Sequence, residues 1–243
     1  FLAELASRVR ERCADRHVHL VLENEANQAR WLEREGGAPA LHTAQWADDI
    51  HNSWHPILTG ENEGYYEDFA DKAVANLGRA LAEGFVYQGD LSKHLGRERG
   101  EPSAHLPPTA FVAFLQNHDQ IGNRALGERL PHIVQPERWA MARGAFLLSP
   151  QIPLLFQGED WDASAPFQFF VDFAEDPDLS KAVREGRRKE FAHFAAFAGH
   201  EDDVPDPTDP KTMERSRVDW DEVSRAPHAD ARAETRRLLA LRQ

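Results

Sequence analysis

Phe111-Val-Ala-Phe-Leu115 runs directly into Gln116-Asn-His-Asp119, and this junction decides the fold. Five consecutive apolar residues without alternation predict a strand that is covered on both faces, as in a parallel sheet. The four polar residues that follow can all form hydrogen bonds, and Gly122 then interrupts the pattern. Polar side chains at the carboxyl end of a buried parallel strand are typical of the active sites of α/β enzymes. The alternative is a polar loop in which His118 and Asp119 form a buried structural pair.

Length and composition describe an ordinary globular protein. The 243 residues are 41% apolar and 28% charged, and the formal net charge is −13. Such an acidic chain repels phosphates, which argues against binding to nucleic acids or to anionic membranes. No apolar run approaches the length of a membrane-spanning helix. The single cysteine, Cys13, excludes an internal disulfide and a thiolate zinc cluster, and we expect a reducing, cytoplasmic location.

Three further apolar segments predict additional strands. We expect four strands in all, near residues 18–22, 42–46, 111–116 and 152–156, with helical patterns between them. Repeated alternation of strands and helices is typical of a parallel sheet. Because a complete (β/α)₈ barrel needs eight such units, we expect an α/β fold that is the second half of a TIM barrel, with about four βα units. Residues 1–243 would form one partial catalytic domain, and the helical patterns at both ends predict a chain cut from a longer protein.

Two connecting segments are assigned from their glycines and prolines. We expect a helix to run to about Arg34 and to end at Gly36-Gly37, since glycine commonly ends helices. The polar segment from Gly89 to Pro108 is expected to be a long loop, and loops of that length are often functional.

Acidic residues follow each predicted strand. They are Glu23 after the first strand, Asp48 and Asp49 after the second, Asp119 after the third, and Glu159 with Asp160 after the fourth. Because the carboxyl ends of barrel strands meet on one face, we expect these carboxylates to surround one opening. Glycoside hydrolysis needs such groups, one to protonate the leaving oxygen and others to stabilise the developing oxocarbenium charge. Trp46, Trp54 and Trp161 are placed to stack on sugar rings, and core packing is the alternative for each.

A metal site is the competing hypothesis from another class of enzyme. His17 and His19 have metal-ligand spacing, and His51 and His55 lie one helical turn apart, close to Asp49. His17 and His19 enter their strand, so they would point away from the catalytic end of a barrel. Because the other spacing often arises by chance, we predict no catalytic metal. A third hypothesis is a carbohydrate-binding domain that has lost its reaction.

Several motifs, in order, resemble one family. Phe114-Leu-Gln-Asn-His-Asp-Gln-Ile-Gly-Asn-Arg-Ala125 resembles the last conserved motif of the α-amylase superfamily, in the form found in maltooligosyltrehalose trehalohydrolases. Val21-Leu-Glu-Asn-Glu-Ala-Asn27 resembles the motif that bears the general acid/base. Further stretches also resemble this family: Gln45-Trp-Ala-Asp-Asp-Ile-His51, Leu58-Thr-Gly-Glu-Asn-Glu-Gly-Tyr-Tyr66, Leu81-Ala-Glu-Gly-Phe-Val-Tyr-Gln88, Leu154-Leu-Phe-Gln-Gly-Glu-Asp-Trp161 and Val183-Arg-Glu-Gly-Arg187. Three positions depart from the family's usual residue: Asn52, Gln157 and Asp160. Glycogen-branching and other α-amylase-type enzymes remain alternatives, although the long match over Gly64–Gln88 favours the trehalohydrolases.

The resemblance implies roles for individual residues. Glu23 is the general acid/base, Asp119 stabilises the transition state and holds the sugar, and His118 hydrogen-bonds the same ring. The expected substrate-binding set is completed by Gln116, Asn117, Asp48, Asp49, His51 and Trp46. Glu23 directly follows an apolar strand, where partial burial favours a protonated acid at the working pH, whereas Glu25 lies farther out. The structural alternative for Glu23 is an acid favoured by a helix dipole. We expect Glu23 and Asp119 to face the same glucose unit.

The resemblance also implies a reaction. It is hydrolysis, with retention, of the α-1,4 bond next to the terminal trehalose of maltooligosyltrehalose, a neutral oligosaccharide, with no metal or organic cofactor. The family's nucleophile is an aspartate two positions after an arginine on the preceding strand, and the chain has no such motif before its first predicted strand. A retaining mechanism requires this second carboxylate about 5 Å from the acid/base, so we expect the chain alone to be inactive. Half a barrel exposes strand edges and apolar surface, so we also expect self-association.

Overall fold

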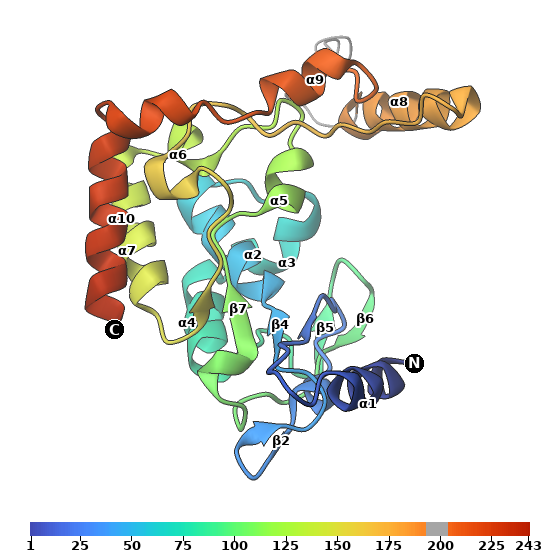
Figure 1. Cartoon of the computed structure of the whole chain (residues 1–243), viewed down its shortest axis with the longest axis vertical. Coiled ribbons are helices and arrows are strands. Elements are labelled where there is room, and N and C mark those ends of the chain that lie inside the picture. Colours follow the sequence, from blue (N-terminus) through green and yellow to red (C-terminus); the bar gives the residue numbers. More distant parts are fainter. Residues whose placement is uncertain (193–203) are drawn as a thin grey trace. The chain divides into compact units, whose positions relative to one another are not determined.

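A computed structural model describes residues 1–192 and 204–243, which form two compact units (Figure 1). Unit 1 contains residues 1–115, 140–154 and 242, and unit 2 contains residues 116–139, 155–241 and 243. Two of the boundaries, after Leu115 and after Leu154, fall just beyond strands. The parallel sheet therefore belongs to unit 1, and the polar segments that follow its third and fourth strands belong to unit 2.

A four-stranded sheet forms the centre of unit 1. Its strands are β1 (Val21–Leu22), β4 (Ala44–Trp46), β7 (Phe111–Ala113) and β8 (Ile152–Pro153), in that spatial order. All neighbours pair in parallel, and Figure 1 shows β4 and β7 side by side. Each strand lies inside one of the ranges where the sequence predicts a strand. The expected α/β fold with a parallel sheet is confirmed at this level.

The position of each strand in the sheet explains its burial. All three residues of β7 are buried, and Phe114 and Leu115 continue the buried run. β1 and β8 each have a strand neighbour on one side only among the described residues, and Val21 and Ile152 are exposed there.

Helices cover this sheet. α2 (Asp48–Thr59) packs against α4 (Ala73–Glu83) and also contacts β7. Ile50, Trp54 and Leu58 are buried at intervals of four residues, which places them on one face of α2. The 3₁₀ helix η2 (Gly64–Tyr66) and α3 (Glu67–Ala70) connect the two helices along the chain. α1 (Leu2–Arg12) precedes β1, and α7 (Pro136–Leu148) leads to β8.

Unit 2 consists of helices and loops. Its elements are α5 (His118–Gly122), α6 (Leu130–Ile133), η4 (Glu159–Trp161), α8 (Pro177–Ala192), α9 (Pro210–Arg215), η6 (Trp220–Ser224) and most of α10 (His228–Arg242). Arg129 is fully buried and ties loops together, because its Nε donates to the Ala165 carbonyl at 2.7 Å and its Nη1 to the Gln157 carbonyl at 2.7 Å. Throughout the part of the chain that the structure describes, we find no helix with the length and apolarity needed to span a membrane.

The segment after β1 corrects one prediction. The helix expected to run to Arg34 is only the short 3₁₀ helix η1 (Ala29–Leu32), and an antiparallel hairpin follows, made of β2 (Arg34–Glu35) and β3 (Ala38–Pro39). Gly36 and Gly37 have φ values of +59° and +84°. Two consecutive residues with positive φ form the tight turn that a two-residue hairpin requires. The glycine pair therefore turns a hairpin and does not end a helix.

The expected long loop after Gly89 also contains a hairpin. β5 (Asp90–Ser92) pairs antiparallel with β6 (Arg97–Arg99). Asp68 of α3 holds the turn of this hairpin, because its Oδ1 accepts hydrogen bonds from the backbone amides of Lys93 and His94 at 2.9 and 3.2 Å. Its Oδ2 accepts the Ser92 hydroxyl at 2.6 Å. The hairpin is thus fixed by a carboxylate that lies far away in the sequence.

We predict that Gly84→Ala destabilises unit 1 by about 3 kcal/mol, since both positive φ and overpacking are costly. Gly84 has φ +95°, and an added Cβ would lie 2.1 Å from the ring of Phe111 in β7. Denaturant unfolding of the variant and the parent sequence measures the change. The control is Gly78→Ala in α4, where a Cβ meets nothing within 4 Å. It should be neutral or stabilising by up to about 1 kcal/mol. Equal stabilities for the two variants would contradict the packing argument.

Candidate active site

Three predicted site residues lie at the carboxyl edge of the sheet in unit 1. Glu23 directly follows β1, Trp46 ends β4, and Asp48 begins α2. The register pairs Leu22 with Gln45 and Trp46 with Val112, so the ends of these strands lie at the same edge. Glu23 is exposed, and Trp46 and Asp48 are partly exposed. This part of the edge is accessible to a ligand from solvent.

Burial does not distinguish Glu23 from Glu25, contrary to our expectation. Both residues are exposed, although Leu22 immediately before Glu23 is buried. Val21 is also exposed, so the apolar strand before Glu23 does not enclose it. The choice of Glu23 as general acid/base therefore rests on the motif and on its place at the strand end.

Asp49 is a buried carboxylate that joins three segments of unit 1. Its side chain is inaccessible, with the residue 1% exposed. Its Oδ2 accepts hydrogen bonds from the Asn27 amide at 2.9 Å, the Val86 backbone at 2.8 Å and the Tyr87 backbone at 3.2 Å. Its Oδ1 lies 3.1 Å from Nη2 of Arg99. With these partners Asp49 cannot touch a sugar in this structure, and the expected substrate contact is replaced by a structural role.

The same network fixes the segment that follows Glu23. The Gln45 amide donates to the Asn24 carbonyl at 2.8 Å and to Oδ1 of Asn27 at 3.2 Å. Asn27 has a φ of +50°, which is unusual for a residue other than glycine. Because these bonds begin one residue after Glu23, they limit the positions that its backbone can take.

His51 is also buried, and its hydrogen bonds define its tautomer. Its Nδ1 lies 2.6 Å from the Leu115 carbonyl, which can only accept, so Nδ1 carries the proton. Its Nε2 then accepts from the Tyr66 hydroxyl at 3.1 Å. Burial, together with the neighbouring His55, lowers the pKa of His51 to about 3, although the bond to Leu115 opposes this. His51 is therefore a neutral link between α2, η2 and the residue before Gln116, and it is 1% exposed. Direct substrate binding by His51 is not supported by this placement.

The alternative metal site does not fit these contacts. Both ring nitrogens of His51 are engaged, Nε2 of His55 lies 2.6 Å from Glu61, and Asp49 is paired with Arg99. His17 and His19 instead contact each other, with 3.3 Å between their ring nitrogens. Within residues 1–192 and 204–243, no group of three or more His, Cys, Asp or Glu side chains is arranged to hold a metal ion.

The polar segment after β7 forms the start of α5 in unit 2. Asn117 is its N-cap and accepts from the Asp119 backbone at 2.8 Å, while the Gln120 side chain accepts from the Asn117 backbone at 3.0 Å. This reciprocal capping box is the physical reason that the strand changes into a helix here. Oε1 of Gln116 accepts from the Leu130 backbone at 2.9 Å.

Capping divides this segment into buried and exposed residues. Gln116 and Asn117 are 1% and 2% exposed, whereas His118 and Asp119 are exposed. Oδ1 of Asp119 accepts from the Asn123 amide at 2.7 Å, which orients its carboxylate. His118 and Asp119 are thus accessible to a ligand, and Gln116 and Asn117 hold the backbone that carries them. The alternative of a buried His–Asp pair is not supported, because both residues are exposed.

Other residues near the predicted strand ends are mostly buried, and Asp160 is partly exposed. Glu159 is 3% exposed and accepts from the Phe156 backbone at 3.0 Å. Trp54 and Trp161 are 4% and 5% exposed, so each packs in the core of its own unit. Of the three tryptophans proposed for stacking, Trp46 alone is partly exposed, and its ring packs edge-on against Phe114 at 6.0 Å.

Sequence reasoning missed Arg99, which pairs with the buried Asp49. Its Nε donates to the Glu25 carbonyl at 2.6 Å, and its guanidinium lies 5.2 Å from the centroid of the Tyr87 ring. The alternating Arg97-Glu-Arg99 pattern between Gly96 and Gly100 was the available signal for a strand with two arginines on one face.

Comparisons with known proteins support one class. No family model matches the chain. The malto-oligosyltrehalose trehalohydrolase of Arthrobacter ramosus is 38% identical over 245 residues, which cover 100% of this chain and 42% of the relative. Its counterpart from Deinococcus radiodurans is 44% identical over 200 residues, which cover 82% of this chain and 32% of the relative. The chain thus spans less than half the length of these relatives.

Solved structures give the same assignment for the fold. The structure superposes with a TM-score of 0.93, at 48% identity, on a Salmonella typhimurium protein assigned provisionally to the α-amylases. The match covers 99% of this chain and 40% of that protein. A more distant match is AmyP in complex with maltose, with a TM-score of 0.50 at 15% identity, which supports the fold alone.

The parallel sheet, the polar strand ends and these likenesses relate the chain to proteins of the α-amylase class. Its motifs and its curated relatives narrow that class further. By sequence, the chain is similar to curated malto-oligosyltrehalose trehalohydrolases, at 38–44% identity in these relatives.

We predict that Asp49→Asn destabilises unit 1 by about 3 kcal/mol, because the change breaks a buried ion pair and leaves Arg99 without its counter-charge. Denaturant unfolding measures the loss. The control is Asp15→Asn, an exposed aspartate with no side-chain contact in the structure, which should change stability by less than about 0.5 kcal/mol. A loss as small as that of the control would show that the buried carboxylate does not hold these segments together.

The buried His51 predicts a pH dependence of stability. Its folded pKa of about 3 lies below its ordinary value of 6.5, so the unfolded chain binds a proton that the folded chain does not. The contribution is fully present above pH 6.5 and decreases as the pH falls toward 3, by up to about 1.4 kcal/mol per pH unit. Urea unfolding between pH 7 and pH 4 should show a shallower decrease for His51→Gln than for the parent sequence. Exposed His94→Gln should keep the parent slope, and equal slopes for all three proteins would contradict this role.

Proposed function

We propose that the full-length parent of this chain hydrolyses the α-1,4 bond next to the terminal trehalose of maltooligosyltrehalose, with retention of configuration. The observation that carries this proposal is the match to named trehalohydrolases over the whole chain, which includes the two motifs with Glu23 and Asp119. The exposure of both carboxylates supports it. In this proposal the chain supplies the second half of a TIM barrel, and its four parallel strands are consistent with that architecture.

Glu23 acts as general acid/base in the proposed mechanism. It protonates the glycosidic oxygen as the bond breaks and later takes a proton from the water that hydrolyses the glycosyl intermediate. Its exposed position at the end of β1 leaves the carboxylate accessible, while the bonds to Asn24 and Asn27 fix the following backbone. The nucleophile would be a further aspartate of the parent protein, about 5 Å from Glu23.

Asp119 and His118 bind the sugar ring at the cleavage point. The Asp119 carboxylate accepts hydrogen bonds from sugar hydroxyls and stabilises positive charge as the oxocarbenium ion develops. Trp46 and Asp48 provide further substrate contacts, since both are partly exposed at the carboxyl edge of the sheet. Within unit 1, the buried residues Asp49 and His51 support α2, which carries Asp48, and within unit 2, the buried residues Gln116 and Asn117 support the backbone of His118 and Asp119. The ligand is a neutral oligosaccharide, and no step requires a metal or an organic cofactor.

Composition and exposed strand edges support proposals for the cellular location and the self-association of the chain. The single cysteine favours a cytoplasmic location. Val21 and Ile152 at the two edge strands are exposed apolar residues, which favours association of the isolated chain with a second copy or with the rest of a barrel.

We predict that Glu23→Gln in the full-length parent lowers kcat for trehalose release from maltotriosyltrehalose by about 10³-fold, because the acid/base is lost. The matched control is Glu11→Gln, an exposed glutamate on α1, which should retain the parental rate. Full activity of Glu23→Gln would overturn the assigned role and favour a non-catalytic carbohydrate-binding function. Formation of new branch points from a glucan, without trehalose release, would favour a branching enzyme.

A further inference from the structure

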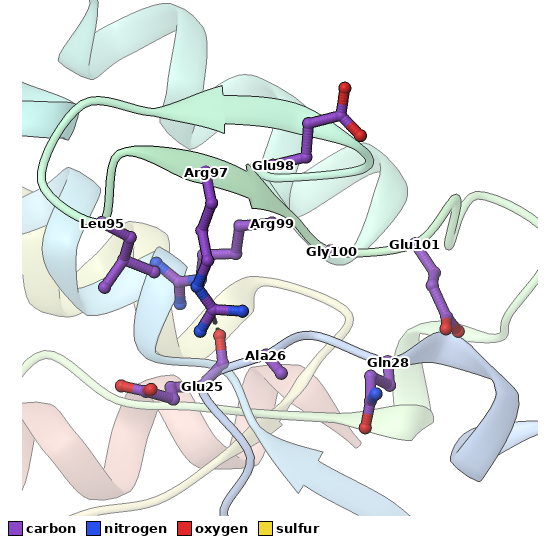
Figure 2. Close-up of a pocket in the computed structure, with 9 residues that line it drawn as sticks. All are labelled: Glu25, Ala26, Gln28, Leu95, Arg97, Glu98, Arg99, Gly100 and Glu101. Atoms are coloured by element: carbon purple, nitrogen blue, oxygen red, sulfur yellow. Dashed lines mark hydrogen bonds between the residues drawn. The ribbon is translucent and has the colours of Figure 1, made fainter.

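A small hollow lies in unit 1 between the segment after β1 and the β5–β6 hairpin. Its volume is about 180 Å³, and it is lined by Glu25, Ala26, Gln28, Leu95, Arg97, Glu98, Arg99, Gly100 and Glu101 (Figure 2). Drug-sized ligands usually occupy about 300–1,000 Å³. The hollow is therefore suited to a single ring.

One wall of the hollow is held in place by Arg99. The Arg99 side chain is 10% exposed, it is paired with the buried Asp49, and its Nε donates to the Glu25 carbonyl at 2.6 Å. The next residue, Gly100, has φ +85°, and an added Cβ would lie 1.7 Å from the Tyr87 carbonyl oxygen. The backbone on this side is thus in direct contact with the core and has little freedom to move.

Arg97 and Glu25 present unused polar groups to the hollow. Arg97 lies two residues before Arg99 on β6, so both side chains project from the same face of the strand. Figure 2 shows Arg97 extending from the hairpin toward the Glu25–Ala26 segment. Among the described residues, the Arg97 guanidinium and the Glu25 carboxylate have no hydrogen-bond or ion-pair partner. Oε1 of Gln28 accepts a hydrogen bond from the Trp31 indole at 2.9 Å. The amide nitrogen of Gln28 has no hydrogen-bond partner among the described residues.

The charges of the lining residues select a class of ligand. The lining residues include Glu25 and Glu101 as well as Arg97 and Arg99, so a phosphate meets carboxylates and a cation meets guanidinium groups, while the Glu98 carboxylate points away from the Glu25–Ala26 segment in Figure 2. A neutral polyhydroxyl ring suits this mixture, because each hydroxyl can both donate to a carboxylate and accept from a guanidinium or an amide.

We propose that this hollow binds one glucose unit of the substrate, held by Arg97, Glu25 and Gln28, at a position beyond the unit that is cleaved. This inference rests on the proposed function, since the ligand is a unit of the same oligosaccharide. Its place in the chain supports it, because Glu25 lies two residues after the proposed acid/base Glu23. Arg99 acts as a positioning residue that fixes this wall of the hollow, and Arg97 forms hydrogen bonds with the sugar.

The test compares Arg97→Ala with Arg12→Ala in the full-length parent. Arg12 is an exposed arginine at the end of α1 whose side chain has no hydrogen bond or ion pair with the described residues, so it is the matched control. We expect Arg97→Ala to raise KM for maltotriosyltrehalose about tenfold, because a charged hydrogen bond to the bound sugar is lost. Glu25→Gln should also raise KM, and thermal unfolding should be unchanged for all three variants. Titration calorimetry with maltotriose and with trehalose then reports binding independently of turnover.

Each outcome decides the proposal. Weaker binding of maltotriose alone assigns the hollow to the glucan side of the cleaved bond, and weaker binding of trehalose alone assigns it to the trehalose side. Equal KM values and equal dissociation constants for Arg97→Ala and Arg12→Ala would overturn the hollow as a sugar site. The proposed function would still stand if the parent released trehalose and Glu23→Gln did not. If the parent releases no trehalose, the proposed function fails, and calorimetry still decides the hollow. Absence of binding of both sugars to the parent would overturn it.

Discussion

The buried carboxylate of Asp49 is the interaction on which the rest of unit 1 depends. An ionised carboxylate away from water is costly unless hydrogen bonds and an opposite charge compensate for it. Asp49 receives both, and its partners come from three segments: the loop after β1, the backbone after α4 and the second strand of the hairpin. None of these segments can move independently without leaving the charge uncompensated. Glu23, the acid at the end of β1, is exposed, and the proposed chemistry is assigned to it and not to Asp49.

The sheet could be predicted because its strands carry their own signal. An unbroken apolar run such as Phe111–Leu115 fits a strand with both faces covered, and the polar residues after it mark the carboxyl end. Local signals were insufficient where distant contacts decide the structure. Gly36-Gly37 is compatible with a helix end and with a hairpin turn, and pairing of β2 with β3 selects the turn. The β5–β6 hairpin has polar strands without apolar alternation, and it is held by Asp68, more than twenty residues away.

The candidate site shows the same limit at the level of single side chains. Adjacent residues such as Asp48 and Asp49 are equivalent in sequence, but successive side chains on a helix point about 100° apart, so one reaches the surface and the other the interior. The pattern after β7 correctly marked a polar cluster, yet only the capping box separates buried Asn117 from exposed Asp119. Arg99 escaped notice because the carbonyl that it binds, that of Glu25, lies 74 residues earlier. The placement of Glu23 and Asp119 around one glucose unit stays a prediction.

The spacing of Arg97 and Arg99 along β6 has a consequence for how such an enzyme can diverge. Alternate residues of a strand share a face, so Arg97 and Arg99 lie next to each other on the same surface of β6. Arg99 is bound to the buried Asp49, whereas Arg97 is exposed. Substitution at position 97 changes the polar groups that line the hollow with little effect on the stability of unit 1. Substitution at position 99 disturbs the buried ion pair. Sequence libraries meant to broaden or redirect ligand choice should therefore randomise position 97 and leave position 99 untouched.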